Sequence, residues 1–123
     1  MAPIELKSRR EALGLSQSRL ADLLDVKQNT VAQWESGVRG IPFGVSQELD
    51  AIEDRVEQVI DNAAEVIASA EASGIPLVLF AYGDDAALWA AIPELAGLPA
   101  VCHRIAMARA RVLADAPIGI TSK

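Results

Sequence analysis

The feature that most constrains the fold is a long segment, residues 46–73, that contains neither glycine nor proline. Its apolar residues recur at alternating intervals of four and three: Val45, Leu49, Ile52, Val56, Val59, Ala63, Val66 and Ala70. This heptad spacing predicts one continuous helix over residues 46–73, roughly 40 Å long at 1.5 Å per residue. So long an apolar stripe must be covered by the rest of the chain, by a second chain or by both.

The N-terminal third has a different pattern, with short periodic segments separated by helix-stop and helix-start residues. We expect helices over residues 3–13, 17–24 and 28–36. Gly14 and Gly37 are suited to end two of these helices, and Ser16 is a natural N-cap for the second. Lys27 precedes the third helix and cannot cap it, so the start of that helix is the least defined boundary. These elements form a compact helical unit over residues 1–44.

Residues 45–123 combine the long helix with a short strand. An apolar run at 77–82 predicts a buried strand, because Pro76 precedes it and Gly83 follows it. A short helix follows, capped by Asp84 or Asp85 and reaching residue 91, and then a final helix over 99–114. A single strand is not stable alone, so we expect it to pair with the C-terminal tail, where 118–121 reads as a second strand, or with its copy in another subunit.

Composition and charge exclude several classes of function. The single Cys102 excludes an intramolecular disulfide and a cysteine-rich zinc site, and the single His103 leaves few combinations for metal or general-base chemistry. The net charge of −6 divides unevenly: residues 1–44 carry 6 basic and 5 acidic side chains, and residues 45–123 carry 5 and 12. The N-terminal third can therefore meet phosphate despite the acidity of the whole chain.

The sequence carries no sign of a membrane segment or of secretion. No apolar run approaches the roughly 18 residues that span a bilayer, and the N-terminus lacks a basic start followed by an apolar stretch. We expect a cytoplasmic protein that is not an enzyme and that uses no metal and no cofactor. Cys102 and His103 are adjacent on a helix and do not face each other, which favours packing over catalysis. No small-molecule ligand is evident from the sequence.

The two helices at 17–24 and 28–36 have the properties of a DNA-reading unit. Leu20, Ala21 and Val26 are small or apolar where the helices must cross closely, while Val31 and Trp34 seat the second helix on the core. The other face of that second helix is polar throughout: Lys27, Gln28, Asn29, Thr30 and Gln33. Asparagine and glutamine amides can pair with adenine N6 and N7 in the major groove, which admits a helix.

Four features together resemble the lambda-repressor-like regulators, the XRE family. They are Ser16-Gln17 at the start of one helix, Leu20-Ala21 inside it, Val26 in the turn and Trp34-Glu35-x-Gly37 at the end of the next helix. The resemblance implies a mainly α fold and base reading by Lys27, Gln28, Asn29 and Gln33. It implies phosphate contact by Ser16, Gln17, Thr30 and Arg39, with Arg19 and Lys7 as weaker candidates. It also implies that Arg10 and Glu35 form a structural ion pair and that Trp34 is structural.

The C-terminal part resembles the YdiL-like regulators, which include anti-CRISPR-associated autorepressors, in the order of a long helix, a short strand, Tyr82-x-Asp84-Asp85-x-x-x-x-Trp89 and a final helix. This resemblance implies a small α+β dimerisation region over residues 45–123 and a homodimer that binds an inverted repeat and represses its own operon. We assign Phe80, Tyr82, Trp89 and Ile92 to the dimer interface, although Trp89 and Ile92 are equally suited to the core.

Two other functions fit the same residues. The first is an antitoxin whose acidic C-terminal part holds a toxin. The second is a protein-interaction module that has kept the fold and lost DNA binding, and the overall acidity of the chain favours it. RNA binding also remains open at this level.

Overall fold

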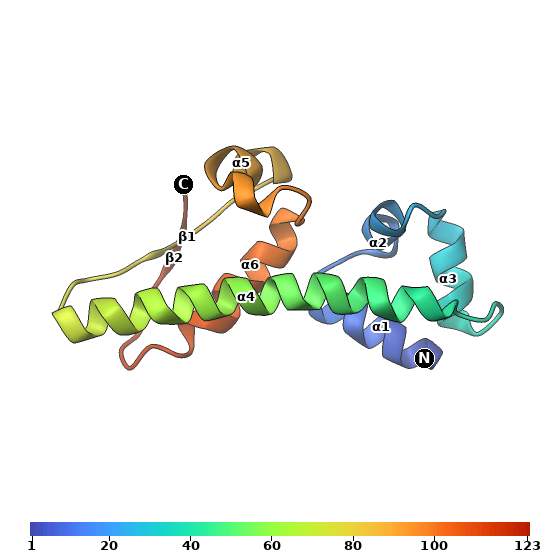
Figure 1. Ribbon diagram of the computed structural model, residues 1–123, viewed down its shortest axis with the longest axis horizontal. Helices are drawn as coiled ribbons and strands as arrows, with labels where there is room; N and C mark the ends of the chain where they lie inside the picture. The colour runs from blue at the N-terminus through green and yellow to red at the C-terminus, as the bar shows by residue number, and fades with distance from the viewer. The chain divides into compact units, whose positions relative to one another are not determined.

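The computed structural model of the protein describes residues 1–123 and contains six α-helices, one 3-10 helix and two short strands (Figure 1). The mainly helical fold with a small sheet near the C-terminus is the predicted class. The chain divides into two compact units, Met1–Glu53 and Asp54–Lys123. The division falls within α4 (Phe43–Ser73), beyond residue 44 where the sequence placed it.

The first unit contains the three short helices that the sequence predicts. They are α1 (Pro3–Ala12), α2 (Gln17–Leu24) and α3 (Gln28–Ser36). The predicted stops are present, because Gly14 and Gly37 have φ angles of 77° and 79°, which glycine adopts without strain. The helix after α3 starts at Phe43, three residues before the predicted position.

The core of the first unit is built mainly from aliphatic side chains. Its buried hydrophobic residues are Leu6, Leu13, Leu15, Leu20, Ala21, Val31, Trp34, Val45 and Leu49. The last two belong to the first turns of α4. This explains why the unit extends to Glu53: the beginning of the long helix is needed to close the core of the three short helices.

The second unit has the remainder of α4, followed by elements that run strand, helix, helix, strand. These are β1 (Leu79–Ala81), α5 (Asp85–Ala91), the 3-10 turn η1 (Pro93–Leu95), α6 (Ala100–Arg111) and β2 (Ile120–Ser122). Asp84 caps α5 as expected, its side chain accepting a hydrogen bond from the Ala87 backbone N–H at 2.8 Å. Tyr82, Leu88 and Ala100 form a buried cluster in this unit.

The two strands pair parallel to each other, with Leu79 opposite Ile120 (Figure 1). Of the two predicted partners for β1, the structure therefore has the C-terminal tail of the same chain. Strand β1 is shorter than the predicted 77–82, and β2 lies further along the chain than the predicted 118–121. Only three residues of the tail pair, and the Leu79 backbone N–H already donates to the Gly119 carbonyl at the start of the ladder.

The final helix ends at Arg111 and not at residue 114 as predicted. The backbone N–H of Asp115 donates to the Glu71 carboxylate of α4 at 2.9 Å. The Arg111 guanidinium donates to the Ile118 carbonyl at 3.2 Å. Both bonds turn the chain away from the helix axis and into the connection to β2.

The heptad seam describes only the first part of α4. Val56 and Val59 are buried as the seam requires, but Val66 is 52 % exposed, while Ile60 and Ile67, which lie outside the seam, are 7 % and 2 % exposed. An α-helix has 3.6 residues per turn, so a strict seven-residue repeat drifts by about 20° per heptad on a straight helix. At the position where the heptad spacing predicts a buried Val66, the buried residue is therefore its neighbour Ile67.

Candidate nucleic-acid interface

Helices α2 and α3 are joined by a short turn whose geometry is fixed at both ends. The Ser16 hydroxyl caps α2 by accepting a hydrogen bond from the Arg19 backbone N–H at 3.0 Å. Asp25 ends α2 in the left-handed conformation, with φ 55°, and its backbone N–H donates to the Asp22 carbonyl. Lys27 then precedes α3 without making a side-chain cap, as its chemistry requires.

Helix α3 presents two chemically distinct faces. Val31 and Trp34 are 0 % and 3 % exposed and lie in the core of the first unit. The candidate base readers occupy the opposite surface, where Lys27, Gln28 and Asn29 are exposed and Gln33 is half-buried. The polar side chains at the start of α3 are therefore available to a duplex.

The other candidate contacts to DNA differ in exposure. Ser16 and Arg39 are exposed, whereas Gln17, Arg19 and Thr30 are half-buried. Arg39 follows α3, and its backbone N–H donates to the Gln33 carbonyl at 3.2 Å, which fixes the start of the loop against the end of the helix. The N-terminus of α2 adds backbone N–H groups that the helix itself does not use.

A chain of hydrogen bonds connects the first helix to the candidate readers. Arg10 donates to both oxygens of Glu35, from Nε at 2.7 Å and from Nη2 at 2.9 Å, and from Nη1 to the Leu15 carbonyl at 2.8 Å. Gln17 Nε2 donates to Glu35 Oε1 at 3.1 Å, and Gln28 Nε2 donates to Gln17 Oε1 at 2.7 Å. Because a carboxylate only accepts, Glu35 fixes the orientation of the Gln17 amide, and that amide fixes Gln28.

The Arg10–Glu35 pair is charged and buried, with 10 % and 4 % of the two side chains exposed. Burial alone raises the pKa of Glu35, but hydrogen bonds from Arg10 and Gln17 and the nearby guanidinium charge outweigh it and hold this pKa below its ordinary value. The hydrogen bond to Glu35 raises the pKa of Arg10. A carboxylate remains the preferred state of Glu35.

Sequence reasoning missed a second arginine that organises this unit. Arg9 donates to the carboxylates of Asp50 and Glu53, the first at 2.7 Å, and to the Ser46 hydroxyl at 3.2 Å. These bonds join α1 to the beginning of α4. The signal was faint, because a basic residue on a helix and two acidic residues more than forty positions later reveal a contact only when the fold is known.

This pairing determines which cations remain for phosphate. Arg9 and Arg10 are bound to carboxylates of their own unit. The exposed cations of the first unit are Lys7, Lys27 and Arg39.

The four residues assigned to a dimer interface lie in the second unit but differ in exposure. Phe80 is 43 % exposed, and Lys123 Nζ lies 5.1 Å from the centre of its ring. Trp89 and Ile92 are half-buried, and Trp89 Nε1 donates to the Leu98 carbonyl at 2.7 Å. Tyr82 is only 6 % exposed and belongs to the unit's own core cluster, so it offers little surface to a partner.

Cys102 and His103 are both buried in the second unit. The chain has no group of three or more histidine, cysteine, aspartate or glutamate side chains placed to hold a metal ion. None of its helices combines the length and the apolar character needed to cross a bilayer.

Comparison with known proteins identifies the first unit. No curated protein matches the chain. The family model described as helix-turn-helix matches residues 6–51, which include most of α1, all of α2 and α3 and the beginning of α4, and does not extend into the second unit. The geometry of α2 and α3 agrees with this match, so residues 6–51 resemble a helix-turn-helix domain of the kind found in DNA-binding transcription regulators.

Proposed function

We propose that the protein is a homodimeric repressor that binds a pseudo-palindromic operator in double-stranded DNA and represses its own operon. The observation that carries the proposal is the division of α3 into a buried apolar face and an exposed polar face at its N-terminal end. A recognition helix placed in the major groove reads base edges with its N-terminal residues.

In this proposal Gln28, Asn29 and Gln33 read bases, and Lys27 lies at the edge of the contact. Gln28 is held by Gln17 through one of its amide hydrogens, at 2.7 Å. Its Oε1 and second hydrogen stay available, which is the donor–acceptor pair that adenine N6 and N7 require. A reader held in one rotamer loses less conformational freedom on binding than a freely rotating side chain.

Phosphate contacts set the position of the domain on the duplex. We assign them to the Ser16 hydroxyl, Arg19, Thr30 and Arg39. Gln17 contributes through its backbone N–H at the start of α2, because its side-chain amide already bonds Glu35 and Gln28. The positive end of the α2 dipole favours a phosphate at this place.

A single nine-residue recognition helix makes few base contacts, and pairing two copies about a two-fold axis doubles them. We propose that two copies dimerise through the second unit, with Phe80, Trp89 and Ile92 in the interface. The operator then consists of two half-sites about 34 Å apart, or a multiple of that distance. A dimer bound across a promoter represses transcription by excluding the polymerase.

The proposal is tested by selecting bound sequences from a random duplex library at a stated salt concentration. We expect an inverted repeat that also occurs upstream of the gene itself. A binding-site logo without two-fold symmetry contradicts the dimer, and the absence of any enriched sequence contradicts sequence-specific binding.

The readers are tested on the selected operator with Gln28→Ala. We expect affinity to fall by about 1–3 kcal/mol, roughly 5- to 150-fold, together with relaxed specificity at one base pair. Gln47→Ala is the matched control, since Gln47 is an exposed glutamine of the same unit on α4. Equal losses for the two variants, or a Gln28 loss that is the same on random DNA, would show that Gln28 reads no base.

A further inference from the structure

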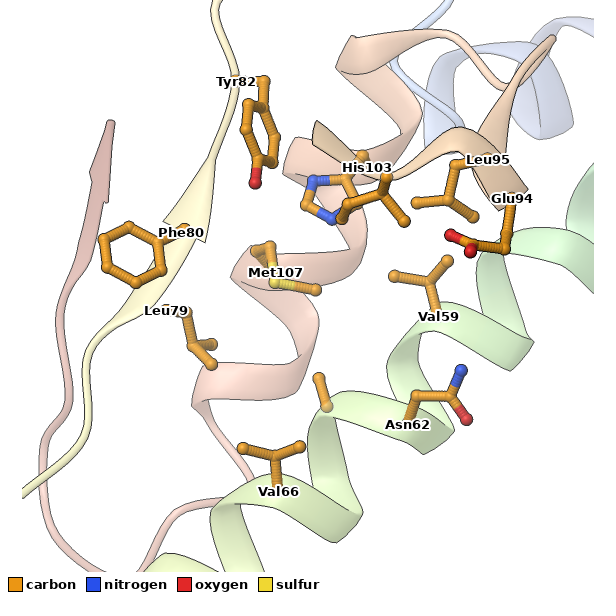
Figure 2. A pocket seen from close by; sticks show the side chains of 12 residues that line it. Val59, Asn62, Val66, Leu79, Phe80, Tyr82, Glu94, Leu95, His103 and Met107 are labelled. Atoms are coloured by element: carbon orange, nitrogen blue, oxygen red, sulfur yellow. The ribbon is translucent and has the colours of Figure 1, made fainter. Parts of the chain in front are cut away.

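The second unit has an apolar groove that the DNA-binding role does not use. It lies between β1 and α4, with α6 along its floor and the turn η1 at one end (Figure 2). Its volume is about 460 Å³, and most of its lining is aliphatic, aromatic or thioether, with Val59, Leu79 and Met107 among the residues that form it. A groove of this size and character is typical of a binding site.

One wall of this groove is an unpaired edge of β1. The ladder to β2 uses the backbone groups of Leu79 and Ala81. The Leu79 N–H donates to the Gly119 carbonyl at 3.0 Å, and the Ala81 carbonyl accepts a hydrogen bond from the Lys123 N–H at 3.3 Å. Because successive residues of a strand direct their backbone groups to opposite edges, the N–H and carbonyl of Phe80 point away from β2.

The side chain of Phe80 supports this orientation. Phe80 lines the groove, but Figure 2 shows its ring turned away from the other lining side chains, towards β2. Lys123 Nζ, just after β2, lies 5.1 Å from the centre of that ring. Phe80 therefore presents its backbone to the groove. Asn62 on the opposite wall is exposed, so the groove is open to solvent along its length.

An unpaired strand edge beside an apolar groove fits an extended peptide. Such a peptide pairs its own backbone with the strand, and its alternate side chains enter the groove. A small apolar molecule would leave the N–H and carbonyl of Phe80 without a partner, and a helix uses almost all of its backbone groups internally. The combination of an edge and a groove therefore selects an extended chain.

The charge of the groove defines a further property of the peptide. Glu94 lines the groove at the end away from Val66 and is exposed (Figure 2). His103 also lines the groove, but burial lowers its pKa, so its ring is neutral at neutral pH. Residues 54–123 carry 9 acidic and 5 basic side chains, so the charge of the whole unit has the same sign as Glu94. A basic residue at one end of the peptide complements this carboxylate.

We propose that this groove binds an extended segment of a partner protein, which adds to β1 as a third strand. Its apolar side chains occupy the groove, and one lysine or arginine lies beside Glu94. The proposal rests neither on DNA binding nor on the proposed homodimer, and the experiment measures peptide binding in the absence of DNA.

The probe is a seven-residue peptide of alternating valine and threonine with a lysine at each end, acetylated and amidated so that the lysines carry its only charges. It is titrated into the full-length protein and followed by heteronuclear NMR. We expect the largest shift changes at Val59, Phe80 and Met107. Replacing both lysines by norleucine should weaken binding about threefold, the size typical of one exposed ion pair.

The ion pair is tested with Glu94→Gln, in which the lysine and norleucine peptides should bind equally well. Asp115→Asn is the matched control, because Asp115 is an exposed acidic residue of the same unit that does not line the groove. In this variant the lysine peptide should keep its advantage of about threefold.

The backbone pairing is tested with two substitutions at Phe80. Phe80→Pro removes the N–H that faces the groove, and the sheet tolerates it because the ladder to β2 uses Leu79 and Ala81. We expect Phe80→Pro to weaken binding of the lysine peptide roughly tenfold. Phe80→Ala removes the ring and keeps the N–H, so it should weaken binding less than about threefold.

Methylated peptides test the same pairing if Phe80→Pro does not fold. N-methylation of the valines removes the N–H groups along one edge of the peptide, and N-methylation of the threonines removes those along the other edge. Because only one edge meets β1, we expect one of these two peptides to lose binding and the other to keep it.

Four results would overturn the proposal. The first is equal weakening by Phe80→Pro and Phe80→Ala, or equal affinity of the two methylated peptides. The second is a norleucine peptide that binds the wild type as tightly as the lysine peptide. The third is a set of shift changes centred on Ile120 and Ser122, which would place the peptide on β2. The fourth is absence of binding to the wild type, and protection of the Phe80 amide from exchange in a dimer would then assign the groove to the second copy.

Discussion

At the scale of single residues, the Arg10–Glu35 pair shows how a buried charge can specify a binding surface. A buried ion pair adds little net stability over an apolar pair of the same shape, but removing one partner leaves the other charge uncompensated. Here the carboxylate also orients Gln17, which in turn holds Gln28. The pair is therefore best understood as setting the geometry of the recognition helix.

We expect Glu35→Gln to lower the free energy of unfolding by about 3 kcal/mol, because it leaves the Arg10 guanidinium buried without a counter-charge. Urea denaturation measures the change. Glu11→Gln is the control, because Glu11 follows Arg10 in the same helix but is exposed. This substitution should lower the free energy of unfolding by less than about 0.5 kcal/mol. Equal effects of the two substitutions would show that the ion pair is not buried in solution.

The same pair predicts a dependence of stability on pH. The pKa of Glu35 is lowered in the folded state, so the unfolded chain binds the proton more readily. Its contribution is complete above the ordinary glutamate pKa of about 4.3 and is lost as the pH falls through the lower folded value. As the pH falls from about 5 to the acid limit of folding, the free energy of unfolding should decline less steeply in Glu35→Gln than in the wild type.

At the scale of elements, the end of α3 depends on backbone conformation more than on side-chain contacts. Gly37 has φ 79°, and a Cβ atom there would meet only Pro3 Cγ, at an ordinary 3.8 Å. We expect Gly37→Ala to cost about 1 kcal/mol through backbone strain alone, measured by thermal or urea unfolding. Gly40→Ala, where a Cβ meets nothing within 4 Å and φ is not left-handed, should be neutral or slightly stabilising.

The register of α4 is the second prediction at this scale. Ile67 is 2 % exposed and Val66 is 52 % exposed, the reverse of what the heptad seam requires. Ile67→Ala should therefore lower the free energy of unfolding by about 2–5 kcal/mol, and Val66→Ala by less than about 0.5 kcal/mol. If Val66→Ala destabilised the protein more than Ile67→Ala, the heptad spacing would describe the buried face after all, and a contact would have to cover Val66.

These elements also show what the sequence can predict. Local signals located all three short helices of the first unit, because Ser16, Gly14 and Gly37 act through the backbone of their own neighbourhood. The long helix was predicted by its lack of glycine and proline. Its buried face was predicted only as far as Ala63, since the choice between Val66 and Ile67 depends on a drift of the helix that a seven-residue repeat conceals.

Contacts between distant segments were beyond local reasoning. The pairing of β1 with the tail was one of two open alternatives, and the bonds of Arg9 to Asp50 and Glu53 were not anticipated. The predicted readers on α3 are accessible because an amphipathic pattern encodes which face is buried. The role of Gln17 in holding Gln28 required the crossing of two helices to be known.

At the scale of the whole molecule, the distribution of charge limits how the protein can approach DNA. The chain as a whole carries a net charge of −6, and two arginines of the first unit are bound to carboxylates of that same unit. Binding must then depend on a few exposed cations, of which Arg39 is the one that follows the recognition helix directly. Few phosphate contacts per copy imply a shallow dependence on salt unless two copies bind together.

The salt dependence of binding can therefore report how many subunits contact the DNA. Each phosphate contact contributes about 0.9 to the slope of log K against log salt concentration. Arg39→Ala should weaken binding to cognate and random duplexes alike, and in a dimer it removes two contacts and reduces the slope by about 1.8. Arg111→Ala, at an exposed position in the second unit, should leave the slope unchanged. A reduction of about 0.9 would mean that only one subunit meets phosphate through Arg39, and no reduction would remove Arg39 from the interface.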